Sequence, residues 1–230
     1  MLAINFADRL VVQPFAAYID SGNFIEHYAP DQEILLRRVI FRDSSVFEPQ
    51  VVSLRAVTAI WWVWNSVRAL ETGHAILAVI SVCILRLDDP SDWPPLYGSP
   101  FEAYTVRRFW GKFWHNCMVP SAWEWASRVA QTLGLRKGSS SEKSFAAFGI
   151  FLVSGISHAV VAWKIREGEA LRDVMFFVAN YGIIVVERGL GRVIGLLWVY
   201  SWFFWMTPRW LYPKFYLWSL QIQHVEPVLA

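Results

Sequence analysis

The chain has few of the residues that build several common kinds of site. It contains 2 cysteines among 230 residues, Cys83 and Cys117. They form no CxxC pair, so a disulfide framework is not indicated, and we expect both to be buried free thiols. Three of the histidines, His27, His74 and His224, are isolated in the sequence. No metal site is therefore expected.

Other absences exclude whole classes of protein. There is no GxSxG elbow, HExxH helix or Walker loop, and no pair of carboxylates within an apolar helix. Glu187 stands beside Arg188 at an expected helix end, where a plain ion pair is the expected role. The net charge is +2 and no Lys/Arg tract carries interleaved aromatics, so no nucleic-acid partner is expected. The N-terminus has an early Asp and Arg and no apolar run, so no cleavable signal peptide is expected.

The longest stretch without Asp, Glu, Lys or Arg is SFAAFGIFLVSGISHAVVAW, residues 144–163. At about 1.5 Å per residue, such a helix spans roughly 30 Å, the thickness of a bilayer's hydrocarbon core. His158 lies inside it. An ionisable side chain at that depth is costly and usually faces a protein interior or a water-filled cavity. His158 is therefore the first candidate for a functional residue.

Several further stretches lack charge, and they set the expected fold class. The chain is 55% hydrophobic and contains 14 Trp, a residue that favours membrane interfaces. Most of the other charge-free stretches are shorter than a full span, but flanking Arg side chains can snorkel and lengthen them. We therefore expect an all-α, polytopic transmembrane helical protein, and the alternative is a large soluble α domain. These stretches are residues 56–67, 72–85, 174–186 and 193–208.

A proline-rich loop and an amphipathic segment lie between the apolar stretches. Residues 87–100 hold four Pro and three Asp, so they predict a structured loop, with Trp93 and Tyr97 as aromatic anchors. Residues 101–135 are amphipathic and are expected to lie at the headgroup layer as interfacial helices. Pro120 should break this helix or start a second piece.

The chain has no internal repeat and short loops, which predict one domain over residues 1–230. Residues 1–50 carry seven acids and four Arg, a charge of −3, and form a polar N-terminal cap. Residues 51–230 form the helical membrane core. Within it we expect a short break at residues 71–73 and the end of the last strong helix at Pro208.

The first motif with chemical potential is RRFWGKFWHN, residues 107–116. A helix here would carry a stripe of Trp110 and Trp114 beside the face of His115. His115 and Asn116 end this aromatic block and could donate hydrogen bonds to a carbonyl in a dry pocket. The alternative is an interfacial aromatic belt with snorkelling Arg, which the composition alone favours.

The second motif is SGISH, which ends at His158. Ser154 and His158 are four apart and share a helix face. Ser154 and Gly155 are small and allow a close approach by another helix or a ligand. An imidazole with an ordinary pKa of about 6.5 is neutral much of the time at pH 7 and can accept a proton. The alternative is a buried histidine bonded to a neighbouring carbonyl.

Together, DWPPLYGSP, RRFWGKFWHN and SGISH resemble the wax-synthase-like branch of the membrane-bound O-acyltransferase family. The similarity is closest to fungal members that acylate terpenoids and other secondary metabolites. It covers roughly residue 88 to the C-terminus, and the FWGKFWHN block is its most specific part. Relatives have more helices before this region, so the resemblance implies an N-terminally shortened core.

The resemblance implies a multi-pass membrane protein of the endoplasmic reticulum. It would transfer an acyl group, most simply acetyl, from acyl-CoA (acetyl-CoA) to a hydroxyl of a hydrophobic acceptor such as a terpenoid. Its partners would be the lipid bilayer, this alcohol and acyl-CoA, with no bound cofactor and no metal. Three other classes stay open: a terpenoid isomerase or cyclase on the same scaffold, a non-catalytic truncated member, and a small-molecule transporter.

The resemblance also implies roles for individual residues. His158 falls on the family's intramembrane histidine and would be the general base. His115 or Asn116 would orient the thioester carbonyl or stabilise its oxyanion. No Ser or Cys nucleophile pairs convincingly with His158, so direct transfer is expected, with Ser154 the exception. The residues expected to bind substrate or acyl-CoA are Arg107, Arg108, Trp110, Lys112, Trp114 and Ser154.

Overall fold

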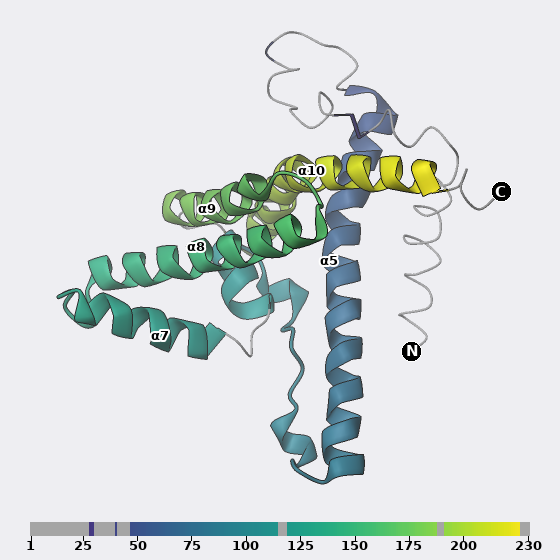
Figure 1. The fold of residues 1–230 in the computed structure, drawn as a ribbon. Helices are drawn as coiled ribbons and strands as arrows, with labels where there is room; N and C mark the ends of the chain where they lie inside the picture. Colours follow the sequence, from purple (N-terminus) through teal and green to yellow (C-terminus); the bar gives the residue numbers. More distant parts are fainter. Residues whose placement is uncertain (1–27, 30–39, 41–46, 115–118, 188–190, 226–230) are drawn as a thin grey trace. The chain divides into compact units, whose positions relative to one another are not determined.

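The computed structural model describes residues 28–29, 40, 47–114, 119–187 and 191–225 (Figure 1). Within these ranges all regular structure is helical and no strand occurs, which confirms the all-α class. The chain forms two compact units. The first unit is Met1–Val63, Val161–Ala170 and Ser201–Ala230, and the second is Trp64–Val160 and Leu171–Tyr200. The expected single domain over residues 1–230 stays a prediction.

The first long helix has no interruption where one was expected. Helix α5 (Pro49–Ala78) runs through residues 71–73 and continues as the π-helix η3 (Val79–Leu85). The predicted break is wrong because a lone Gly73 costs a helix only about 1 kcal/mol, and cooperative helix on both sides outweighs that cost. The π-helix ends at Arg86, whose φ is 55° and whose N–H bonds to Ser81 O.

Two of the described helical segments are long and apolar enough to cross a bilayer, judged by length and composition. They are Pro49–Leu85 and Ser140–Ile165. The second contains the charge-free stretch of residues 144–163. The polytopic topology itself stays a prediction.

Cys83 lies on η3 and is exposed, so the expectation of a buried thiol is wrong. The reason is local, because η3 has no buried residue within this chain. Cys117 lies outside the described residues.

Helix α7 (Val119–Thr132) confirms that Pro120 starts a second helical piece. A proline is tolerated in the first turn, where its missing N–H would have no helical partner. The helix is amphipathic: Ala126 and Ala130 are buried, whereas Trp123 and Trp125 are exposed.

Helix α8 (Ser140–Ile165) runs antiparallel to α7 (Figure 1), and it lies in the second unit as far as Val160. Ser139 Oγ accepts a hydrogen bond from Glu142 N at 3.1 Å. The buried Glu142 carboxylate accepts from Gly138 N at 2.5 Å and from Gln131 Nε2 at 2.7 Å. The polar loop expected at residues 136–143 is therefore shorter, because its second half forms the start of α8.

Helix α9 (Ala170–Val186) packs closely on α8 at Gly155. A Cβ at Gly155 would lie 2.9 Å from the Cα of Val174. The small residue therefore permits this contact, as the SGISH motif predicted. Phe176 and Phe177 of α9 are buried in the same unit.

Helix α10 (Arg192–Val225) passes through Pro208 and Pro213, so the predicted end at Pro208 is wrong. A proline inside a helix costs about 3 kcal/mol. Here Pro208 is fully buried in the first unit. Trp62 packs on either side of it, against Phe203 at 5.3 Å and Trp210 at 5.7 Å. This aromatic packing offsets the lost backbone hydrogen bond.

Candidate active site

The proline-rich loop is fixed to α5 through Trp93 and Tyr97, which the sequence predicted as aromatic anchors. It contains two 3-10 turns, η4 (Pro90–Asp92) and η5 (Pro100–Glu102). The Trp93 ring packs on His74 with centroids 5.1 Å apart. Tyr97 N donates to the Glu71 carboxylate at 3.2 Å. Trp93 is therefore confirmed as an aromatic anchor to α5, whereas Tyr97 is joined to α5 through its backbone and places its ring against Trp114.

The same loop braces residues 107–114 (RRFWGKFW), the described part of the first motif and here named the Trp-rich block. Gly98 N donates to Phe113 O at 2.9 Å. A Cβ at Gly98 would clash with the carbonyl oxygen of Lys112, so only glycine fits this approach. The Tyr97 ring meets Trp114 edge-on at 5.3 Å. The loop thus fixes the position of the block's last turn.

The Trp-rich block is helical only in part. The short α6 (Val106–Arg108) leads into the π-helix η6 (Phe109–Phe113). Trp114 is extended, with φ −78° and ψ 120°, so the helix does not continue through it. Trp114 is buried and stacks on Phe109 at 5.3 Å and 22°. His115 and Asn116, two of the three predicted catalytic residues, lie outside the described residues.

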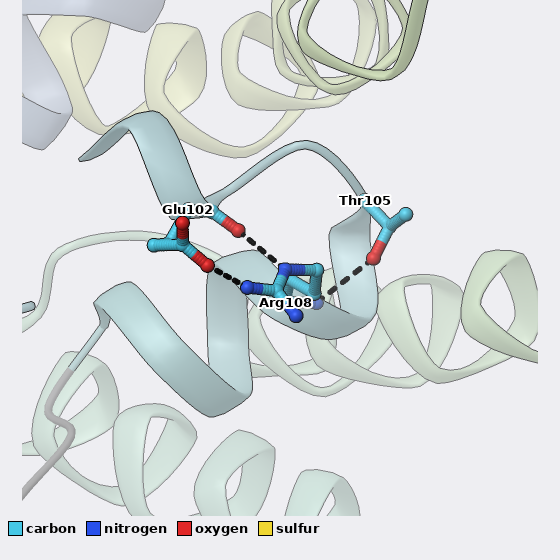
Figure 2. A network of polar contacts seen from close by, with 3 residues as sticks. All are labelled: Glu102, Thr105 and Arg108. Atoms are coloured by element: carbon cyan, nitrogen blue, oxygen red, sulfur yellow. Dashed lines mark hydrogen bonds and ion pairs between the residues drawn. The ribbon is translucent and has the colours of Figure 1, made fainter. Parts of the chain in front are cut away.

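Arg108 is held by partners within its own loop (Figure 2). Its Nε donates to Glu102 O at 2.7 Å, and its guanidinium pairs with the Glu102 carboxylate. Its backbone N–H donates to Thr105 Oγ1 at 3.0 Å, which caps α6. The guanidinium also lies over the Tyr104 ring at 4.3 Å. Lys112, by contrast, is exposed.

Glu187 joins the end of α9 to the start of α6. Its carboxylate accepts from Val106 N at 2.8 Å and from Arg107 N at 2.7 Å. A carboxylate at a helix N-terminus satisfies N–H groups that have no helical partner. Arg107 donates from its guanidinium to Ile184 O at 3.3 Å. Sequence reasoning missed this cap, and Arg188, the expected partner, lies outside the described residues.

Asn180 is a buried residue that sequence reasoning missed. Its side chain is fully buried in the second unit. Its Oδ1 accepts from Trp110 Nε1 at 3.0 Å, and its Nδ2 donates to Phe176 O at 2.8 Å. The signal was present, because Asn180 is an amide inside the charge-free stretch 174–186. The reasoning applied to His158 would have selected it.

His158 lies on the exposed side of α8, so its ring does not face the interior of the described chain, which was one of the two expected surroundings. The buried stripe of the helix follows Phe151, Gly155 and Ala159, at four-residue spacing. His158 falls at the edge of that stripe. Its ring stacks on Phe177 at 4.8 Å and 26°.

Phe177 brings the two predicted motifs together. It stacks on His158 and also packs against Trp110 at 5.7 Å. The Phe177 ring thus contacts both Trp110 of the Trp-rich block and His158 of SGISH. Ser154 is half-buried on α8.

Residues 93–179 match the model of the membrane bound O-acyl transferase family. This span holds Trp110, His158 and Phe177, and the match confirms the resemblance seen in the motifs. Among curated relatives, acetyltransferase ple2 of Rhodocybe pseudopiperita is 32% identical over 64% of this chain and 42% of its own length. Acetyltransferase eriL of Hericium erinaceus is 28% identical over 75% of this chain and 50% of its own.

A third relative, acetyltransferase aurG of Calcarisporium arbuscula, is 27% identical over 81% of this chain and 48% of its own length. The chain therefore spans about half the length of the curated relatives it matches. No solved structure matches it.

Proposed function

We propose that this protein is a membrane-bound O-acyltransferase that moves an acyl group, most simply acetyl, from acyl-CoA to a hydroxyl of a hydrophobic acceptor such as a terpenoid. The observation that carries the proposal is the family match over residues 93–179, which encloses both the Trp-rich block and His158. The relatives reported above are all named acetyltransferases, which supports an acetyl donor.

In the proposed reaction, His158 is the general base. An imidazole nitrogen takes the proton of the alcohol while the alcohol oxygen attacks the thioester carbonyl, and a positioned base typically contributes about 10²–10⁴-fold. The C–O bond forms, the C–S bond breaks, and the proton on His158 passes to the departing thiolate. The stack on Phe177 restricts the ring's orientation, and the exposed face of the ring gives substrate access to it.

The developing oxyanion needs hydrogen-bond donors, and His115 and Asn116 are proposed for this role. They directly follow Trp114, which is buried and packed on Phe109 and Tyr97. Electrostatic stabilisation of an oxyanion requires donors that are held in place before the reaction.

We place the reaction in the endoplasmic reticulum membrane, in a multi-pass protein. The two apolar helical segments, Pro49–Leu85 and Ser140–Ile165, support insertion. A lipid-embedded site is accessible to a hydrophobic alcohol, because this acceptor can partition into the bilayer and reach the enzyme from there.

The test uses the full chain in microsomal membranes with acetyl-CoA and a pool of terpenoid alcohols, and mass spectrometry of the products. His158→Ala should lower the rate by about 10²–10⁴-fold at unchanged protein level. His74→Ala is the matched control, since the His74 ring also packs against an aromatic ring, Trp93, but lies outside the match. Full activity in His158→Ala would rule out His158 as the general base. Product formed without acyl-CoA would rule out acyl transfer. An acyl group trapped on Ser154 would show transfer through an acyl-enzyme instead of direct transfer.

A further inference from the structure

A pocket of about 480 Å³ lies at the C-terminal end of α8, in the first unit. Its volume is in the range of small-molecule sites. Five residues line it, and none belongs to the site described above. They are Trp163, Lys164, Arg166, Gly168 and Leu217.

The pocket presents two cations that form no ion pair with the residues the structure describes. Lys164 and Arg166 are exposed, and neither side chain makes an ion pair or hydrogen bond to any residue that the structure describes. The adjacent Glu167 is directed elsewhere, to Lys214 at 3.7 Å. Arg108, by comparison, is fully engaged with Glu102. Two available cations in a concave surface indicate an anionic ligand.

Trp163 supplies a flat aromatic surface beside these cations. Its side chain is 72% exposed although it is the largest apolar residue of the pocket. An exposed indole next to Lys and Arg is the combination that binds nucleotides, because the ring stacks on a base while the cations meet phosphates.

Arg166 occupies a backbone position that favours glycine. Its φ is 58°, and α8 ends there with Glu167 N bonded to Ala162 O and Arg166 N bonded to Trp163 O. This pattern of helix end usually has glycine at the left-handed residue. An arginine there is strained, and such strain concentrates at functional sites. The position therefore favours a role for the side chain.

Gly168 completes the pocket with a φ of 116°, which only glycine adopts readily. A Cβ there would approach Leu217 Cδ1 to 3.3 Å. The glycine thus keeps the wall that Leu217 forms in place.

We propose that this pocket binds the phosphate-bearing adenine nucleotide of acyl-CoA, with the base on Trp163 and the phosphates on Lys164 and Arg166. The identity of the donor rests on the proposed function. An anionic lipid headgroup would offer the same phosphate chemistry, but it has no flat ring for the indole. The nucleotide accounts for both the cations and the exposed aromatic face.

The first test compares donors with and without the nucleotide. Trp163→Leu should raise KM for acetyl-CoA about tenfold, within the range for losing a base stack, with little change in kcat. The rate with the acetyl thioester of N-acetylcysteamine, which has no nucleotide, should not change. Trp163→Phe should restore most of the affinity, and Trp125→Leu, which removes another exposed Trp, should have no effect. Equal losses with both donors would overturn the proposal.

The second test uses two arginines in the same backbone conformation. Arg166→Gly should raise KM for acetyl-CoA severalfold while leaving the Tm unchanged or higher, because glycine relieves the left-handed strain. Arg86→Gly is the matched control, since Arg86 has a φ of 55° at another helix end and does not line the pocket. An unchanged KM in Arg166→Gly, or the same increase in Arg86→Gly, would contradict the proposal.

A binding measurement separates this inference from the proposed function. Equilibrium dialysis of the full chain in detergent with labelled adenosine 3′,5′-bisphosphate should show binding that Trp163→Leu weakens about tenfold. If the chain binds the nucleotide but transfers no acyl group, the pocket assignment is supported and the proposed acyltransferase function is ruled out. If the chain transfers an acyl group but does not bind the nucleotide, only the pocket assignment is ruled out. Displacement of the nucleotide by phosphatidylglycerol vesicles, rather than by CoA, would overturn the assignment in favour of a lipid headgroup.

Discussion

The amide of Asn180 connects α9 to the Trp-rich block through its hydrogen bond with Trp110. A buried amide without partners costs free energy, but Asn180 uses both its oxygen and its nitrogen. Trp110 in turn packs on Phe177, and the Phe177 ring stacks on His158. The catalytic candidate is therefore supported by a chain of contacts that ends at a buried polar group.

We predict that Trp110→Phe lowers the free energy of unfolding by about 1–3 kcal/mol. The substitution keeps an aromatic ring but removes the N–H donor, so Asn180 Oδ1 remains buried without that partner. Thermal unfolding of the detergent-solubilised protein measures the change. Trp125→Phe on the exposed side of α7 should be close to neutral.

A double-mutant cycle with Asn180→Leu tests whether the hydrogen bond is the cause. In the double variant both polar partners are absent, so its loss should be smaller than the sum of the two single losses. Strict additivity would show that Trp110 and Asn180 contribute independently.

At the scale of elements, the end of α9 and the start of α6 are joined by one carboxylate. We predict that Glu187→Ala lowers the free energy of unfolding by about 0.5–2 kcal/mol, as for other lost helix caps, because two backbone N–H groups lose their acceptor. Thermal unfolding measures this. Glu124→Ala breaks an exposed i,i+4 pair with Arg128 and should cost less than about 0.5 kcal/mol. Equal effects would mean that the cap at Glu187 is worth no more than a surface ion pair.

The packing of α8 on α9 gives a prediction with a control on the same helix. Gly155→Ala should destabilise the protein by about 1–3 kcal/mol, because the added Cβ meets the Val174 backbone at 2.9 Å. Gly149→Ala meets nothing within 4 Å and should stabilise α8 by about 0.5–1 kcal/mol. Opposite shifts in Tm would support the packing, and a stabilising Gly155→Ala would contradict it. Because Gly155 is three residues from His158, acyl transfer should also fall in that variant.

At the scale of the whole molecule, the main expectation is insertion in a bilayer. Cys83 lies on the apolar η3 and is exposed in the isolated chain, so lipid would have to cover it. The labelling experiment uses a Cys117→Ser variant, so that Cys83 is the cysteine that reacts. We predict that a water-soluble maleimide labels Cys83 at least about tenfold more slowly in open membrane fragments than in the detergent-denatured protein. The reason is that the reactive thiolate needs water.

The control for this labelling is a cysteine at Ser91 in the proline-rich loop, in a chain without Cys83 and Cys117. Ser91 is exposed between Pro90 and Asp92, and its replacement should react rapidly in membranes. Equal rates for the two thiols in membranes would place η3 outside the hydrocarbon core.

Much of the fold followed from patterns within single segments. The charge-free stretch around His158 predicted α8, Pro120 marked the start of α7, and Trp93 was correctly predicted as a loop anchor. The errors arose where packing outweighed a local signal, as at Pro208 inside α10. Local propensity is a weak prior when a buried aromatic cluster stabilises the other outcome.

The site divides in the same way between sequence and tertiary structure. Residue types and spacing alone identified the Trp-rich block, the SGISH motif and the family they resemble, because these features lie within short segments of the chain. Only the tertiary structure showed that Phe177 joins the two motifs, that Asn180 and Glu187 support them, and that His158 lies at an exposed edge. Contacts between residues many positions apart depend on how helices pack, and no local pattern encodes that packing.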